Sequence, residues 1–151
     1  MHLPTIIVRH SGERPRKCTA TPLRCLDDFL FYRYPVKQAL DLNDYVRLGL
    51  GGEPLSHTDA NKGLLVLDAN WRRAMKMEKS FAHVPVRSLP SLTTAYPRHS
   101  KINDDPAVGL ATIEAIYAAL TIMKKDTRGI LDAYHWRDRF LELNRNFFPS
   151  W

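Results

Sequence analysis

The residues best suited to chemistry are a carboxylate and an indole that follow the most apolar stretch of the chain. Asp68, Asn70 and Trp71 come directly after residues 63–67, Gly-Leu-Leu-Val-Leu. Such a run is typical of a parallel strand buried on both faces, and ligands of open α/β sheets bind beyond the carboxyl ends of these strands. The segment therefore indicates a site where Asp68 orients a substrate or acts as a general base. The alternative is a helix cap by Asp68 or Asn70, with Trp71 in the core.

Two further segments pair a threonine with groups that bind sugars or anions. Residues 16–20, Arg-Lys-Cys-Thr-Ala, place Thr19 after a basic loop, where its hydroxyl and N–H could contact a ribose or a phosphate. Thr112 opens an apolar helical stripe, and the unpaired N–H groups of a helix start are a natural seat for a carboxylate. Each segment also fits a structural role, as a surface turn or as a first helical turn in which Glu114 favours the dipole.

Histidine and cysteine spacing gives no metal site. The six histidines are scattered, without an HExxH motif and without an i, i+4 pair on one predicted helix face. Cys18 and Cys25 do not have zinc-knuckle spacing, and no second pair completes a site. They fit two free thiols in a reducing compartment. GxGxxG, Walker and GxSxG motifs are also absent from the sequence.

The elements that must position these residues alternate between strands and helices and then become helical. Strands are predicted at residues 3–9, 28–34, 45–50, 63–67 and 84–89, with a loop at 10–22 and a turn at Gly51-Gly52. Helices are predicted at 71–79, 109–123, 126–133 and 134–148. This order predicts an α/β part over residues 1–92 and a mainly helical part over 93–151, within one compact unit.

Composition permits a nucleic-acid partner and argues against a membrane span. The chain is 44% hydrophobic and 25% charged, so it can bury a core, and it has no apolar run of spanning length. The first residues lack the charged and then apolar pattern of a secretory signal peptide, so the cytoplasm is the expected compartment. A net charge of +6 fits either an RNA-binding surface or a solvated basic one. Basic residues gather near positions 14–24, 72–79, 98–101 and 137–145.

Five sequence blocks occur in the same order as in one known enzyme family. They lie at residues 16–23, 63–74, 86–97, 109–120 and 140–145. In that order they resemble the small-subunit rRNA aminocarboxypropyltransferases that use S-adenosylmethionine (SAM), and to a lesser degree the DTW-domain tRNA enzymes. The resemblance implies a SPOUT-like parallel sheet with a C-terminal trefoil knot. The knot would hold SAM with its propyl chain, rather than its methyl group, facing the acceptor.

The resemblance also implies roles for individual residues. Thr19 would contact the ribose of SAM, Trp71 would pack on the methionine part, and Thr112 would hold the carboxylate. Further contacts to the nucleoside fall on Leu67, Leu89 and Val108, the last where the family usually has an aromatic residue near the adenine.

One segment departs from the family pattern. Tyr96-Pro97 replaces the usual Asn-Pro, and extra residues separate it from Thr112, so residues 98–105 resemble the DTW relatives slightly more. The cysteine-rich metal site of the DTW group is absent, whereas residues 16–19 and 140–145 match the rRNA enzymes. Contacts to RNA are expected from Arg16, Lys17, Arg72, Arg73, Tyr96, Arg98 and Lys101.

The expected reaction transfers the 3-amino-3-carboxypropyl group of SAM to N3 of a uridine-type base in RNA, with small-subunit rRNA favoured. It releases methylthioadenosine, needs no metal, and gives Asp68 the role of base or orienter. A helical C-terminus in place of an open sheet edge favours a monomer. Three alternatives stay open: transfer to a tRNA uridine, SPOUT-type methyl transfer to RNA, and a non-catalytic RNA-binding factor in ribosome assembly.

Overall fold

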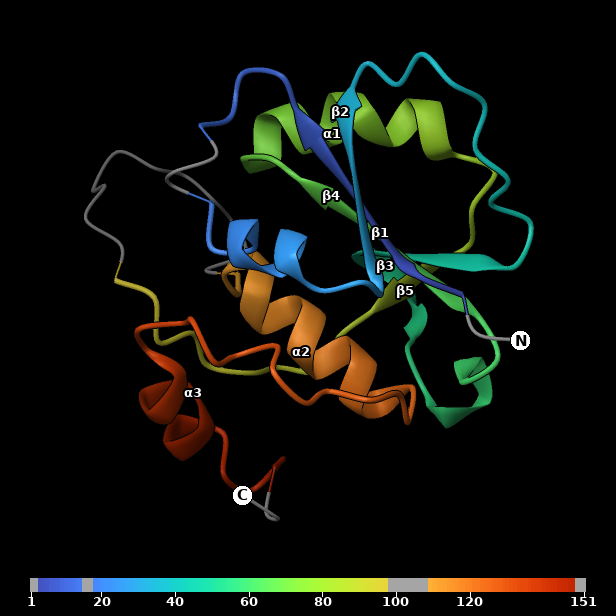
Figure 1. Ribbon diagram of the computed structural model, residues 1–151. Helices are drawn as coiled ribbons and strands as arrows, with labels where there is room; N and C mark the ends of the chain where they lie inside the picture. The colour runs from blue at the N-terminus through green and yellow to red at the C-terminus, as the bar shows by residue number, and fades with distance from the viewer. Residues whose placement is uncertain (1–2, 15–17, 98–108, 149–151) are drawn as a thin grey trace.

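A five-stranded parallel sheet forms the centre of the protein, as the α/β pattern predicts (Figure 1). The computed structural model describes residues 3–14, 18–97 and 109–148. The sheet has the order β2-β1-β4-β3-β5, and every neighbouring pair is parallel. The strands are β1 (Thr5–His10), β2 (Phe29–Tyr34), β3 (Tyr45–Pro54), β4 (Gly63–Asp68) and β5 (Val86–Ser88).

Helices cover both faces of this sheet. The α-helices are α1 (Trp71–Glu78), α2 (Thr112–Ile122) and α3 (Arg137–Leu143), and short 3-10 helices are η2 (Thr21–Cys25), η3 (His57–Asp59) and η4 (Lys79–Phe81). Helices α1 and α2 lie on opposite faces (Figure 1). None of the helices in the described part of the chain is long and apolar enough to cross a membrane.

Strand alternation explains why each face has its own core. In β4, Leu64 and Val66 face α2, whereas Leu65 faces α1 and packs with Met77. The same two-residue period places Asp68 on the α2 face, just beyond the apolar layer. The polar end of β4 is therefore directed toward the start of α2.

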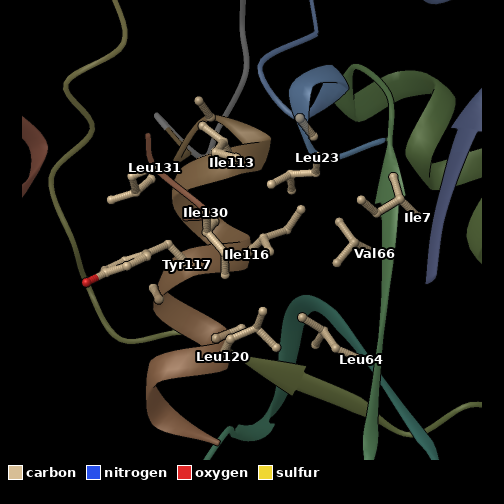
Figure 2. Packing of buried hydrophobic residues seen from close by; sticks show 14 of the residues in the cluster. Ile7, Leu23, Leu64, Val66, Ile113, Ile116, Tyr117, Leu120, Ile130 and Leu131 are labelled. Carbon is tan, nitrogen blue, oxygen red and sulfur yellow. The ribbon is translucent and has the colours of Figure 1, made fainter. Parts of the chain in front are cut away.

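Helix α2 is apolar on nearly all sides because two layers bury it. Ile113, Ile116 and Leu120 pack in one cluster with Leu64 and Val66 of the sheet (Figure 2). The same cluster contains Ile130, Leu131 and Phe140 from the chain after α2. A helix that is hydrophobic all round belongs in an interior, and here the sheet and the C-terminal segment provide that interior.

The predicted helix over residues 126–133 is wrong, because the chain forms turns there. Gly129 has a φ of +84°, which a helix does not accommodate, and Asp126 Oδ1 accepts a hydrogen bond from the N–H of Arg128. The predicted helix over 134–148 shortens to α3. Apolar periodicity predicts helices here, but the apolar residues of this part instead pack against α2.

The predicted turn at Gly51-Gly52 lies inside β3 instead of after it. Gly51 has a φ of +79°, and the pairing of β3 with β5 shifts register between Leu48 and Glu53. A positive φ and a register shift are the signs of a bulge. The glycines therefore interrupt the ladder, and the strand resumes and continues to Pro54.

Candidate functional site

A buried carboxylate lies at the carboxyl end of β4 and is held by three donors. Asp68 is 4% exposed, and its Oδ2 accepts a hydrogen bond from Nε of Arg9 at 2.9 Å. The thiol of Cys18 also donates to Oδ2, and the hydroxyl of Thr112 donates to Oδ1 at 3.0 Å. Strand β1, the loop before η2 and helix α2 thus meet at one side chain. Such a carboxylate is well suited to hold neighbouring groups in place.

Two of these donors, Cys18 and Arg9, are held so that each can donate a hydrogen bond to the carboxylate. Burial raises the pKa of the Cys18 thiol to about 11, and the nearby charge of Asp68 adds to this effect, so the thiol keeps its proton at neutral pH. Arg9 lies beside Asp68 in the register of β1 and β4, and its Nη2 donates to the hydroxyl of Thr21 at 3.0 Å. Arg9 is not among the site residues predicted from the sequence, although a charge at the end of an apolar strand is a usable signal.

A pocket of about 480 Å³ opens next to Thr112 at the carboxyl edge of the sheet. The end of β4, the irregular part of β3, the residues after β5 and the start of α2 surround it. This volume is within the range of small-molecule sites. Three predicted SAM contacts, Leu67, Leu89 and Thr112, line this pocket together. Its other side chains include Leu48, Leu50, Val66, Ser88, Ser91, Leu92 and Leu110.

Thr19 lies beside the start of α2 and is not among the residues that line this pocket. Its hydroxyl oxygen accepts a hydrogen bond from the N–H of Ile113 at 3.1 Å, which satisfies one donor of the first helical turn. The hydroxyl of Thr112 is directed to Asp68. Thr19, Asp68 and Thr112 therefore converge on one end of α2, although they lie far apart in the sequence.

A second buried carboxylate fixes the residues that follow the pocket-lining segment 88–92 in the sequence. Glu114 is fully buried and accepts hydrogen bonds from the N–H groups of Ala95 and Ala111 and from the hydroxyls of Thr94 and Tyr134. These four donors fill both oxygens of the carboxylate. The sequence alone predicts for Glu114 only a role near the helix dipole, because its partners come from distant segments.

Asn144 adds a second tie to the same segment. Its Oδ1 accepts from the N–H of Thr93 at 2.8 Å, and its Nδ2 donates to the carbonyl of Thr93 at 2.9 Å. Glu114 and Asn144 together hold residues 93–95 against α2 and the C-terminal part, and we call this pair the polar clamp. Because Leu92 lines the pocket, the polar clamp also supports the pocket wall.

The residues expected to contact RNA do not form one cluster in the described part of the chain. Arg72 is exposed on α1. Arg73 pairs with Glu13, and Tyr96 packs edge to face against Trp136 with ring centroids 5.2 Å apart. Arg16, Lys17, Arg98, Lys101 and the expected SAM contact Val108 lie outside the described residues.

The helix-cap alternative holds at the start of α1. Asn70 caps the helix by accepting from the N–H of Arg73 at 2.9 Å. Trp71 is the first residue of α1. Asn70 therefore has the structural role, and Asp68 is left free of capping. Among the described residues, no group of three His, Cys, Asp or Glu side chains could hold a metal ion.

This fold and its pocket define a class of protein: an α/β protein with a pocket at the carboxyl edge of a parallel sheet. The chain belongs to the family described as "Ribosome biogenesis protein, C-terminal", which matches residues 50–151.

One relative and one solved structure resemble nearly the whole chain, and a second relative resembles about half of it. The 16S rRNA aminocarboxypropyltransferase of Methanobrevibacter smithii is 28% identical over 97% of this chain and 86% of its own length. The enzyme of the same name from Thermoplasma acidophilum is 37% identical over 56% of this chain and 50% of its own length. The SAM-dependent rRNA:acp-transferase Tsr3 from Vulcanisaeta distributa has a TM-score of 0.74 at 28% identity, covering 99% of this chain and 82% of that one.

Proposed function

We propose that this protein transfers the 3-amino-3-carboxypropyl group of SAM to N3 of a uridine-type base in small-subunit rRNA. The observation that carries the proposal is the likeness over nearly the full chain to enzymes named for this activity. The pocket beside Asp68 and Thr112 supplies a place for the donor at the expected edge of the sheet. SAM is the donor substrate, and the reaction uses no metal.

The pocket is chemically suited to a nucleoside with a charged tail. Leu67 and Leu89 give it apolar walls for the adenosine part, while Thr112 brings a polar group to one side. Thr19 lies next to Thr112 and is a candidate for the ribose. The Thr112 hydroxyl donates its hydrogen bond to Asp68. The carboxylate of SAM would therefore have to bind backbone N–H groups of this helical turn, or the Thr112 hydroxyl would have to rotate toward it. Trp71 and Val108 complete the proposed set.

The reaction requires positioning more than acid catalysis. N3 of the base forms a bond with Cγ of the methionine chain, and the Cγ–sulfur bond breaks with its electron pair going to sulfur, which gives neutral methylthioadenosine. The proton on N3 is lost to a base or to water. A sulfonium is already a good leaving group, so orientation of the two substrates supplies most of the rate.

The contacts of Asp68 favour the role of orienter over that of general base. Three donors occupy the carboxylate, and one of them is the guanidinium of Arg9. Asp68 is also not among the residues that line the pocket, so its oxygens are directed at these three donors and not at a base bound beside SAM. We therefore infer that Asp68 fixes Thr112 and the start of α2 beside the donor.

Several broader properties follow from the same proposal. We place the chain with the SPOUT-like proteins related to the DTW enzymes, as one unit with a C-terminal trefoil knot around the donor. Residues 93–151, which include α2 and α3, would complete the SAM site begun by residues 1–92. We further propose a cytoplasmic monomer whose basic surface, including Arg72 on α1, contacts the RNA backbone.

A double-label assay tests the function directly. The protein is incubated with SAM labelled separately in its methyl and its carboxyl carbon, with small-subunit rRNA and bulk tRNA as acceptors. Carboxyl label in rRNA, without methyl label and with release of methylthioadenosine, is the expected result. Methyl label in RNA would make the protein a methyltransferase, and carboxyl label in tRNA alone would change the substrate. RNA binding without SAM binding would identify a non-catalytic assembly factor.

A further inference from the structure

A second pocket, of about 290 Å³, lies at the carboxyl ends of β1 and β2, and the mechanism above does not use it. Arg9, Arg24, Arg33, Phe31, Tyr32 and Glu13 contribute to its lining. Strand alternation places Phe31 and Arg33 of β2 on the same sheet face as Arg9 of β1, and Arg33 is the register partner of Arg9. The two guanidinium groups therefore belong to neighbouring strands at one edge of the sheet.

Some of the charged side chains in this pocket have ion-pair partners and others, within the described part of the chain, do not. Arg9 is paired with Asp68, and the carboxylate of Glu13 is paired with Arg73. Arg24 and Arg33 are both exposed, and within the described residues neither has an ion-pair partner. The guanidinium carbons of Arg9 and Arg24 each lie 5.2 Å from the ring centroid of Phe31. The pocket thus presents two available cations beside an aromatic ring.

Arg9 connects this pocket to the proposed donor pocket. Its guanidinium contacts Asp68, and Asp68 accepts from Thr112, which lines the donor pocket. Both pockets open at the carboxyl edge of the sheet, because their strands are parallel. A polymer seated in the second pocket would therefore pass next to the donor.

We propose that the second pocket binds a single-stranded nucleotide of the acceptor RNA that flanks the modified base. Arg24 and Arg33 bind its phosphate, since guanidinium forks match phosphate oxygens. Phe31, which lies on the same sheet face as Arg9 and Arg33, offers aromatic surface to its base, which is how splayed single-stranded bases are commonly held. The assignment rests on the proposed function, and it names which surface positions the RNA.

The first test measures binding of a short oligouridylate by fluorescence anisotropy over a series of salt concentrations. Arg24→Gln and Arg33→Gln are each expected to weaken binding about tenfold and to lower the slope of log affinity against log salt by about 0.7. Arg139→Gln removes the same charge from the exposed surface of α3 and serves as the matched control, with little change expected. Arg33→Lys keeps the positive charge but loses the planar guanidinium fork. Its affinity for oligouridylate should therefore lie between that of Arg33→Gln and that of the Arg139→Gln control.

Titration with SAM separates this proposal from the proposed function. All variants should bind SAM as the wild type does, because Arg24 and Arg33 are absent from the donor pocket. If the wild type binds no SAM while Arg24→Gln and Arg33→Gln still lose oligouridylate affinity, the nucleotide pocket stands and the transfer reaction fails. If both variants bind oligouridylate as Arg139→Gln does, the nucleotide pocket is overturned.

Photocrosslinking locates the base independently of the charge changes. Oligouridylate that carries 4-thiouridine is irradiated with the wild-type protein, and the labelled peptide is identified by mass spectrometry. Attachment within residues 29–34 is expected, because Phe31 and Tyr32 line the pocket. Attachment only to peptides from α3 or from the end of β3 would contradict the assignment.

Discussion

At the scale of single residues, Asp68 shows how one side chain joins three segments. Arg9, Cys18 and Thr112 all donate to it, and each comes from a different part of the chain. Removing its charge leaves the Arg9 guanidinium buried without its ionic partner, which typically costs about 3 kcal/mol or more. The consequences for catalysis and for stability can be separated by experiment.

Asp68→Asn is expected to lower kcat by about 100-fold through misplacement of Thr112 and the start of α2. The informative measurement is the pH dependence of kcat. If Asp68 orients the site, the variant retains the shape of the wild-type profile at a reduced level. Loss of the rising limb in the variant would instead identify Asp68 as the general base.

Cys18 gives a pH-dependent contribution to stability with a definite sign. Its pKa is about 11 in the folded protein, above the ordinary value of 9.0, so between these values the folded state retains a proton that the unfolded state releases. The contribution is complete below pH 9 and is lost as the pH rises toward 11, by about 2–3 kcal/mol in total. Urea unfolding of Cys18→Ala should show a smaller loss over this window than the wild type.

Cys25→Ala is the matched control for this measurement, because Cys25 is exposed. Above pH 9 the free energy of unfolding of Cys25→Ala should fall with pH as much as that of the wild type. An identical pH dependence in Cys18→Ala and the wild type would show that the buried thiol is not responsible. Tyr117, whose pKa burial raises to about 12, contributes equally to all three proteins.

At the scale of elements, the polar clamp determines where the segment after β5 runs. Glu114 lies in the first turn of α2, and its four donors come from the residues before that helix, from residues 94–95 and from Tyr134. A buried carboxylate with all of its acceptor sites filled specifies one arrangement of these segments. The polar clamp therefore positions one wall of the donor pocket.

Glu114→Gln places an amide N–H₂ against two donors in a fully buried site. The expected cost is about 2–4 kcal/mol in the free energy of unfolding, together with a raised KM for SAM, since the segment adjoins Leu92. Denaturant unfolding and steady-state kinetics measure these two effects. Glu142→Gln makes the same substitution at an exposed position of α3 and should change stability by less than about 0.5 kcal/mol. Equal effects of the two substitutions would contradict the polar clamp.

The elements also show what the sequence could and could not predict. Apolar and aromatic runs located all five strands, although the turn expected at Gly51-Gly52 lies inside β3. The position of Asp68 at the end of a buried strand was also predictable from the apolar run before it. The helix expected at 126–133 failed because apolar periodicity does not register the positive φ of Gly129. Arg9, Glu114 and Asn144 were missed as site-forming groups because their partners lie far along the chain and depend on how segments pack.

At the scale of the whole molecule, binding of SAM should stabilise the folded protein by mass action. With SAM at 100 times its Kd, the gain is about 2.7 kcal/mol, which thermal unfolding with and without SAM would detect as a raised Tm. Methylthioadenosine shares the nucleoside and should raise the Tm as well. A Tm that does not respond to either compound would contradict the assignment of the donor pocket.

The polar clamp has a consequence for the timing of protein synthesis. Asn144 holds Thr93 from a position 51 residues further along the chain. A chain still emerging from the ribosome can assemble its strands in order, but it lacks this tie until α3 has been made. The pocket proposed for SAM therefore lacks one of its supports until Asn144 has been synthesised, so the order of synthesis places completion of this pocket after assembly of the sheet.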